Sequence, residues 1–534
     1  MLSPYVWFAA LGPLALVVVG IVPFGSSGRA AAAARAGIAA ALIALVVAVL
    51  CAGAVMARGT LHTPLLGAAG VGFGLYLDSL SATMYCLVSF IGVIVVAYSR
   101  NYLDGDPGHV RFTRYLCLTL AAVLLSIVSG NLLQFTFAWI ATSMGLHKLL
   151  VFYPERPAAV IAARKKLIAS RIGDLCLVGA MVLLYQRFGS LDYSVIFPGA
   201  DALRAVGIDG KVHVAAILLV CTGLLKSAQF PLHGWLIEVM ETPTPVSALL
   251  HAGIINAGGF LVLRFSHVIA LSLPSLETLV LIGGFTALFG SVVMLTQTSI
   301  KSALAHSTIA QMGFMMLECG LAAFPAALLH IVAHSLYKAH AFLSSGSVID
   351  IARASWTPSP GGKPHPARLV FAIVGVFAIA IVVGRLFGIT LTERPGEFAL
   401  AATLLLALVH LVANGIDERP SLFVVGRTLV AALVVAVAYF SLQYGMSVVY
   451  AGALPVIEAL RDPLGIAVVV AVIGSFAVVT FLQGLVPGEA GKPRWQALYA
   501  HVSNGLYVNT FANRLVLRYW PLPPAPAAPT TTRR

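Results

Sequence analysis

The chain has 534 residues, of which 59% are hydrophobic and only 10% are charged, and its mean hydropathy is +0.95. This balance excludes a soluble globular domain and predicts a polytopic helical membrane protein. The net charge of +13 is assigned to basic loops facing the cytoplasm and anionic lipid, so no nucleic-acid partner is expected. None of the six cysteines has CxxC spacing, and neither a disulfide framework nor a cysteine metal site is indicated.

Apolar segments of membrane-spanning length follow one another along the chain and predict an all-α bundle of about 13–15 transmembrane helices. They centre on residues 5–24, 31–56, 75–98, 115–130, 131–152, 167–187, 212–241, 244–265, 275–296, 302–322, 324–351, 367–389, 397–415, 422–444 and 463–485. Arginine and lysine are concentrated in the loops after odd-numbered spans. This bias predicts an outside amino terminus and a cytoplasmic carboxyl terminus.

Ionisable side chains interrupt several of these spans, although an ionised group at the centre of a membrane helix costs roughly 2.5–3.5 kcal/mol. Arg171 and Asp174 come first, and their i, i+3 spacing allows an ion pair within one helix, either structural or functional.

The stretch from Gly223 to Phe265 is the centre of the chain's chemistry. Ionisable side chains in this stretch include Lys226, His233, Glu238, Glu241 and His251. Pro231 removes a helical hydrogen-bond donor and predicts a helix break inside 212–241. Broken backbone at membrane depth suits a water-filled proton or ion path, since a lysine there can release or accept a proton. A structural kink beside a snorkelling lysine is the alternative.

The sequence HIVAHSLYKAHAFL places His330, His334 and Lys338 on one helical face at spacings of four. The histidine pair also has zinc-ligand spacing, but no third ligand of the usual kind stands nearby, so no metal is predicted. The LALVHLV segment around His410 faintly resembles the SALLHAG segment around His251, as in the inverted repeats of transporters.

Three stretches resemble the antiporter-like membrane subunits of respiratory complex I and of the Mrp sodium/proton antiporters. They are KSAQFPLHGWLIEVMETPTPVSALLHAG, QTSIKSALAHSTIAQMGFMM and HIVAHSLYKAHAFL, and the resemblance covers roughly residues 70–415. It implies that Lys226 carries protons in a first half-channel, that His330, His334 and Lys338 continue a polar axis, and that Arg171 and Asp174 match the family's arginine–aspartate helix. The expected parts are N-terminal helices (1–110), two antiporter-like halves (111–265 and 266–415), C-terminal helices (416–488) and a cytoplasmic amphipathic segment with a disordered tail (489–534).

The chain departs from the family at both ends of this axis. In FAWIATSMGLHKLL, Thr142 stands where the family has a glutamate, with His147 and Lys148 after it. A hydroxyl cannot balance the charge of a lysine as a carboxylate does. The lysine of the twelfth span is also missing; IVVGRLFGIT offers only Arg385, which cannot deprotonate.

Residues 492–520 differ from the spans. Trp495, Leu498, Val502 and Leu506 recur at helical spacing among polar residues. The pattern predicts an amphipathic helix that docks a partner or lies on the membrane surface, and an ordinary surface helix fits equally well.

The departures and this tail resemble one branch of the family, the membrane subunits of the DAB energy-coupled inorganic carbon pumps. The branch implies a large cytoplasmic partner, DabA, that resembles a zinc β-carbonic anhydrase and hydrates CO2. Flow of protons or sodium through this chain, in a bacterial inner membrane, would make the hydration run one way. The chain itself would then be no enzyme and hold no cofactor or metal.

Two alternatives remain open. The chain could be a proton-pumping subunit of complex I, a hydrogenase or an Mrp antiporter, against which the missing glutamate and twelfth-span lysine argue. It could also be a membrane scaffold that has lost conduction, against which the retained lysines and histidines argue.

Overall fold

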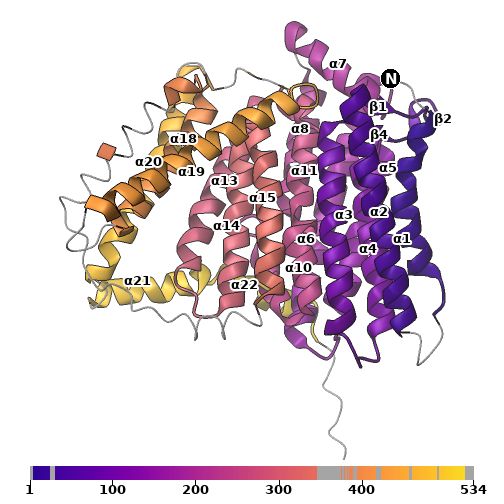
Figure 1. The fold of residues 1–534 in the computed structure, drawn as a ribbon, viewed down its shortest axis with the longest axis horizontal. Coiled ribbons are helices and arrows are strands. Elements are labelled where there is room, and N and C mark those ends of the chain that lie inside the picture. Colours follow the sequence, from indigo (N-terminus) through magenta and orange to yellow (C-terminus); the bar gives the residue numbers. More distant parts are fainter. Residues whose placement is uncertain are drawn as a thin grey trace, which may run out of the picture.

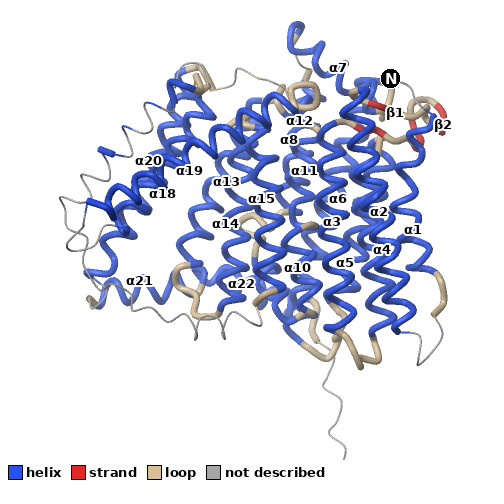
Figure 2. The backbone as a smooth tube through the Cα atoms, viewed as in Figure 1, coloured by secondary structure: helices blue, strands red, loops and turns tan. Residues whose placement is uncertain are grey.

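The computed structural model describes residues 4–24, 30–207, 209–345, 394–415, 422–455, 457, 460–489 and 492–522, and short helical pieces between 374 and 388. Within these ranges the protein is a row of helices that run side by side between two faces (Figure 1). The amino terminus lies at one face and the helices α21 and α22 near the carboxyl terminus lie along the other. Helices dominate, and the short strands are confined to the amino-terminal face (Figure 2).

The first half of the chain forms most of the tightly packed bundle. Its elements are η1 (Pro4–Ala10), α1 (Leu11–Ile21), α2 (Ala30–Arg58), β1 (Leu61–His62), β2 (Leu66–Ala68), β3 (Val71–Phe73), β4 (Tyr76–Leu77), α3 (Ser79–Tyr102), α4 (His109–Val128), α5 (Leu132–Leu150), α6 (Pro157–Phe188), α7 (Tyr193–Val206) and α8 (Gly210–Lys226). The strands form two small antiparallel pairs, β1 with β4 and β2 with β3.

The second half begins with interrupted helices. Its elements are α9 (Gly234–Glu238), η2 (Val239–Glu241), α10 (Thr244–Ala252), η3 (Ile254–Asn256), α11 (Ala257–Arg264), α12 (Ser266–Ile269), α13 (Leu273–Met294), α14 (Ile300–Gly320), α15 (Phe324–Leu343), α18 (Pro395–Gly415), α19 (Leu422–Val449), α20 (Pro463–Glu489), α21 (Pro493–Ser503), η4 (Gly505–Tyr507) and α22 (Val508–Tyr519).

The prediction of an all-α membrane protein is confirmed. Eight helices in the described part are long and apolar enough to cross a membrane. Between the expected spans 167–187 and 212–241 the chain forms the additional helix α7, whose amino terminus is capped by Asp192. The span expected at 167–187 begins ten residues earlier, at Pro157. The span expected at 367–389 lies largely outside the described residues.

Two helix breaks lie next to each other inside the bundle. The predicted break after Lys226 is confirmed, and the span expected to be continuous at 244–265 is broken at Gly253. The Ser227 hydroxyl donates a hydrogen bond to the Ile255 carbonyl (3.0 Å), which joins the two breaks. Side chains thus satisfy backbone groups that water would otherwise have to satisfy at membrane depth.

Close backbone approach holds these two breaks together. A Cβ atom on Gly258 of α11 would lie 2.3 Å from the Gly223 carbonyl oxygen of α8 and 2.2 Å from the Ser227 hydroxyl. Only glycine therefore fits at this crossing without displacement of the other helix.

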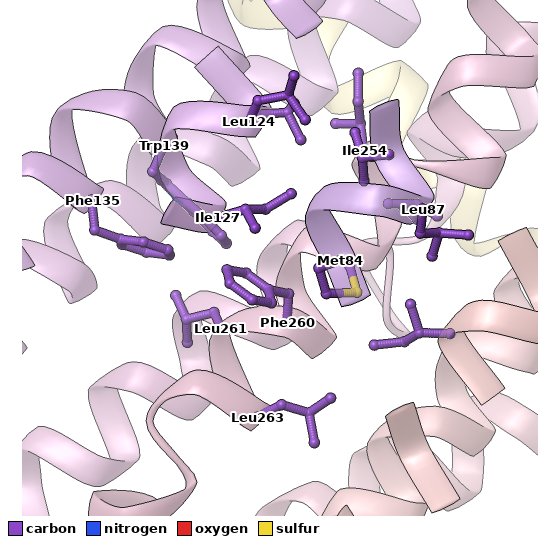
Figure 3. Close-up of a cluster of buried hydrophobic side chains, with 14 of the residues drawn as sticks. Met84, Leu87, Leu124, Ile127, Phe135, Trp139, Ile254, Phe260, Leu261 and Leu263 are labelled. Carbon is purple, nitrogen blue, oxygen red and sulfur yellow. The ribbon is translucent and has the colours of Figure 1, made fainter. Parts of the chain in front are cut away.

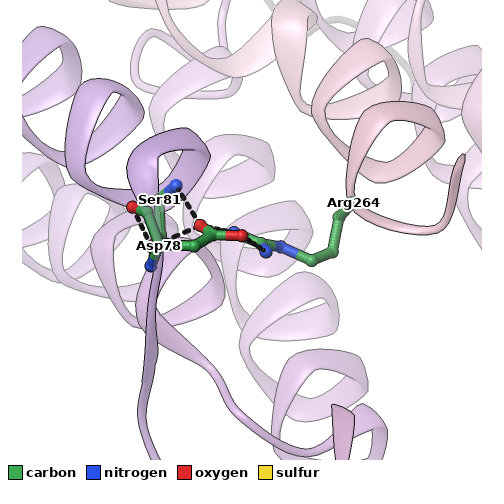
Figure 4. Close-up of polar contacts among 3 residues, drawn as sticks. All are labelled: Asp78, Ser81 and Arg264. Carbon is green, nitrogen blue, oxygen red and sulfur yellow. Dashed lines mark hydrogen bonds and ion pairs between the residues drawn. The ribbon is translucent and has the colours of Figure 1, made fainter. Parts of the chain in front are cut away.

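A buried ion pair fixes the amino-terminal face of the bundle. Arg264, at the end of α11, donates from both terminal nitrogens to the two carboxylate oxygens of Asp78, at 2.7 and 3.1 Å (Figure 4). Asp78 also caps α3 through a reciprocal pair of hydrogen bonds with Ser81. The carboxylate is thereby saturated, as a buried charge must be.

Apolar side chains from α3, α4, α5 and α11 fill the space between the helix crossing at Gly258 and the Asp78–Arg264 ion pair. Figure 3 shows Met84, Leu124, Phe135 and Phe260 converging from the four helices. Trp139 of α5 lies at the edge of this cluster. The core thus packs directly against the broken helices.

The Gly258 contact gives a stability prediction. Gly258→Ala should lower the free energy of unfolding by roughly 1–3 kcal/mol, because the added methyl group overpacks the crossing of α8 and α11. The measurement is the fraction of detergent-solubilised protein that stays monodisperse after heating. Gly53→Ala in α2 is the control, since a Cβ atom there meets nothing within 4 Å. Equal thermal stability of the two variants would contradict the assigned crossing.

Candidate functional site

Lys226 ends α8 at the first break and is buried. Its ammonium nitrogen lies 4.4 Å from the centroid of the Trp139 ring of α5, and the side chain has no hydrogen-bond partner among the described residues. Lys226 and Lys166 both line a cavity of about 10 Å³, which is close to the size that one water needs. A desolvated lysine on an aromatic face gains about 2 kcal/mol or more, but Trp139 offers no proton acceptor.

The carboxylate near Lys226 comes from α6. Asp174 is 2.7 Å from the guanidinium of Arg171 and also interacts electrostatically with Lys226 and Lys166. The Thr142 hydroxyl, aligned with the family's glutamate, instead donates to the Ala138 carbonyl of its own helix (2.9 Å). Asp174 therefore supplies the counter-charge of the first cluster, which consists of Lys166, Arg171, Asp174 and Lys226. The comparison with the family's sequence pattern showed only that α5 lacks the usual carboxylate.

Lys166 also belongs to this cluster, although the sequence analysis did not identify it as a site residue. It lies inside α6, is 2% exposed, and donates to the carbonyl and hydroxyl oxygens of Ser143 at 2.6 and 2.7 Å. His147 is close enough to interact electrostatically with it, whereas Lys148 is exposed. The early start of α6 explains the error, because it carries the Arg-Lys-Lys run into the bundle.

A second cluster lies on α10, α14 and α15. His251 is buried, bonds the Thr308 hydroxyl through Nδ1 (3.0 Å) and stacks on Phe342 at 4.2 Å. Lys338 is fully buried and donates to the Leu304 carbonyl (3.1 Å). His251 interacts electrostatically with Lys338. The contacts of His251 therefore connect α10, next to the helix break, with α14 and α15.

The second cluster continues along α15 to a carboxylate that the sequence analysis missed. His330 Nδ1 lies 2.9 Å from an oxygen of Glu318 on α14, and its ring centroid is 6.2 Å from that of His334. Neither nitrogen of the buried His334 has a hydrogen-bond partner among the described residues. A cavity of about 680 Å³ touches Glu318, His330, His334 and Lys338.

Other predicted residues lie elsewhere. His233 packs between Phe230 and Phe289. Glu241 pairs with Arg156 at the surface, 3.9 Å apart. Arg385 is exposed on a short helical piece, and His410 lies in α18 with its side chain outside the described set. His251, His330, His334 and Lys338 thus form one connected group with Glu318, whereas His233 and Glu241 make their contacts elsewhere.

The carboxyl-terminal segment is bound to the bundle through Glu238. Asn509 and Asn513 of α22 both donate to Glu238 (3.0 and 2.6 Å) and both accept from Lys165 (2.6 Å each). Lys165 also pairs directly with Glu238 at 2.8 Å. Glu238 therefore anchors this segment rather than lining the Lys226 cluster.

The single helix expected over Lys492–Trp520 is two helices. Leu506 and Tyr507 have positive φ and separate α21 from α22. Of the predicted docking residues, Leu498 and Leu506 are about half exposed (48% and 49%), while Trp495 and Val502 are more covered. Among the described residues, no three His, Cys, Asp or Glu side chains come together as a metal ion would require.

The sequence matches two family models. Residues 65–113 match the amino-terminal model of complex I chain 5, and residues 129–357 match the transmembrane model of NADH:quinone oxidoreductase and Mrp antiporters. A chain of the Mrp complex from Dietzia sp. has a similar structure, with a TM-score of 0.55 and 25% identity over 96% of this chain and 55% of that chain.

Two curated relatives are inorganic carbon transporter subunits by name. The probable subunit DabB2 of Halothiobacillus neapolitanus is 41% identical over 463 residues, which are 85% of this chain and 82% of that protein. The probable subunit DabB of Hydrogenovibrio crunogenus is 42% identical over 340 residues, covering 62% of this chain and 64% of that protein. The chain therefore belongs to the DabB branch of the antiporter-like family of complex I and Mrp membrane subunits.

Proposed function

We propose that this chain translocates a cation, a proton or sodium, for an inorganic carbon accumulation complex in a bacterial inner membrane. The observation that carries the proposal is the presence of two buried lysine clusters, each with its own carboxylate. Lys226 is near Asp174, and Lys338 is connected through two histidines to Glu318. Intramembrane groups of this kind mark ion paths by default.

In the first cluster, Arg171 and Lys226 compete for one carboxylate. When Asp174 interacts with Lys226, the ammonium is stabilised and holds its proton. When Asp174 stays with Arg171, Lys226 lacks a counter-charge, which disfavours its charged form. Movement of the Asp174 carboxylate between Arg171 and Lys226 therefore controls whether Lys226 holds or releases its proton.

The second cluster would receive the charge that the first releases. Lys338 has one backbone carbonyl as its hydrogen-bond acceptor and His251 nearby, so its charge is sensitive to the state of both. A membrane potential supplies about 2.3 kcal/mol per charge per 100 mV. At about 1.4 kcal/mol per tenfold ratio, one proton at roughly 150 mV supports a concentration ratio of a few hundred.

We further propose a DabA-like cytoplasmic partner with a carbonic-anhydrase-like zinc site, whose CO2 hydration is made one-way by this flow. The names of the two curated relatives support an inorganic carbon substrate. The alternative is a proton-pumping subunit of a quinone oxidoreductase or an Mrp antiporter, which the description of the transmembrane family model favours. Requirement for a zinc-binding partner separates the two.

The lysine clusters give the first functional prediction. Lys226→Ala and Lys338→Ala should each abolish growth at air-level CO2 of a carbonic-anhydrase-deficient host that expresses the complex. Assembly should persist, because loss of an intramembrane charge removes its insertion cost. Lys→Arg should fail as well, since arginine does not deprotonate. The exposed Lys148, changed to Ala, is the control. Growth that persists with the lysine substitutions and with an uncoupler would contradict cation flow. The chain would then be a membrane scaffold.

The orientation is a second prediction. Arg111, Arg156 and Lys165 make contacts on the face where α22 lies, and acidic Asp192 and Asp209 begin helices at the opposite end. The positive-inside rule then places α22 in the cytoplasm. A carboxyl-terminal fluorescent protein should therefore be fluorescent and alkaline phosphatase at the same position inactive. An active phosphatase would reverse the orientation and the partner's side.

The carboxyl-terminal segment gives a third prediction. Leu498→Asp together with Leu506→Asp should strip the partner from the membrane while this chain stays inserted, because both side chains point away from the bundle. Copurification of the partner is the measurement. Leu66→Asp, at an exposed site in β2, is the control. Partner yield equal to that of the control would favour a lipid-surface role for α21.

A further inference from the structure

Glu318 is a buried carboxylate that no motif explains. It lies two residues before the end of α14, on a helix whose first residues are near the carboxyl-terminal segment, since Gln297 bonds the Ser503 carbonyl. The end of α14 is therefore near the opposite face, which the proposed orientation makes the outer one. Its side chain is about 5% exposed.

A continuous set of titratable groups joins Glu318 to Lys338. Glu318 contacts His330 at 2.9 Å, and His334 and Lys338 follow on the same face of α15. Eight residues of α-helix from His330 to Lys338 rise about 12 Å. Since His334 interacts electrostatically with both His330 and Lys338, the groups are close enough to influence one another's charge.

A cavity borders this set of groups. Glu318, His330, His334 and Lys338 all line the space of about 680 Å³, together with polar residues such as Gln311 and Ser307. A space of that volume with several polar partners can hold many waters. Tyr439 of α19 lines it from the other side and interacts electrostatically with Glu318.

The chemistry of the lining groups favours protons over sodium. Transporters coordinate sodium with clustered oxygens, such as the carbonyls of unwound helices. Along α15 the groups are instead two imidazoles and an amine, which bind and release protons. Glu318 supplies a single carboxylate at their end.

We propose that Glu318 is the outer proton-exchange group of the second half, an inference that rests on the proposed cation flow. A proton from cavity water binds the Glu318 carboxylate and passes to Nδ1 of His330. His330 releases its Nε2 proton toward His334, and His334 in turn protonates the neutral amine of Lys338. Only O–H and N–H bonds form and break, and net charge is conserved at each transfer. Glu318 thus fills the acid–base role that Arg385, which cannot deprotonate, leaves vacant.

Glu318→Gln is the discriminating variant. The glutamine amide oxygen can still accept from His330, so a merely structural clamp would survive, but it cannot carry a proton. We expect normal copurification with the partner and loss of uncoupler-sensitive growth at air-level CO2. Glu277→Gln, at a half-buried carboxylate near the start of α13 that is not among the described cavity residues, should grow as the unaltered complex does.

The outcomes separate this inference from the proposed function. Normal growth of Glu318→Gln with failure of Lys338→Ala overturns the role of Glu318 and leaves cation flow standing. Normal growth of Lys226→Ala and Lys338→Ala overturns cation flow itself.

A measurement on the unaltered complex covers the case in which the Gln variant does not assemble. A hydrophobic carbodiimide adds to protonated carboxyl groups in membranes to form a stable N-acylurea. Peptide mass spectrometry of treated membranes should find this adduct on Glu318. A Glu318 peptide that stays unlabelled while the complex loses its activity would overturn the proposal.

Discussion

The crossing of two broken helices is the constraint on which the rest of the structure depends. A helix that stops inside a bilayer leaves carbonyl groups that must find donors within the protein. Here the Ser227 hydroxyl at the first break donates a hydrogen bond to the Ile255 carbonyl at the second. The close contact of Gly258 with Gly223 brings the two breaks together. Lys226 sits at the carboxyl end of α8, where the helix dipole favours a cation. The break that has to be satisfied is thus also what positions the lysine.

The buried carboxylates of Asp78 and Glu318 differ in how many hydrogen bonds their oxygens accept. This difference distinguishes a structural carboxylate from one that can exchange a proton. Asp78 accepts both Arg264 nitrogens and the backbone and hydroxyl of Ser81, so its charge is fixed by geometry. Glu318 has one described side-chain partner, His330, and borders a cavity. A saturated carboxylate holds helices together, whereas one with free oxygens beside water can exchange a proton.

The sequence predicts features that depend on one helix alone, but it does not predict contacts between side chains of two helices. Pro231 predicted the break, and the spacing of four placed His330, His334 and Lys338 on one face, because both features depend on neighbours along the chain. Asp174 and Lys166 could not be assigned to Lys226, since nothing in α6 or α8 alone gives their relative rotation. Glu318 and His330 are 12 residues apart on the two helices of a hairpin, and α7 lies between two predicted spans.

The attachment of α22 to the bundle lies next to the first lysine cluster. Lys165 and Glu238 form a mostly buried pair whose remaining hydrogen bonds go to Asn509 and Asn513. Breaking up a buried, hydrogen-bonded pair costs several kcal/mol, so this contact holds α22 to the bundle. Lys165 is followed on α6 by Lys166, which lines the small cavity beside Lys226. The residue that holds α22 and the lysine beside Lys226 are therefore neighbours in one turn of α6.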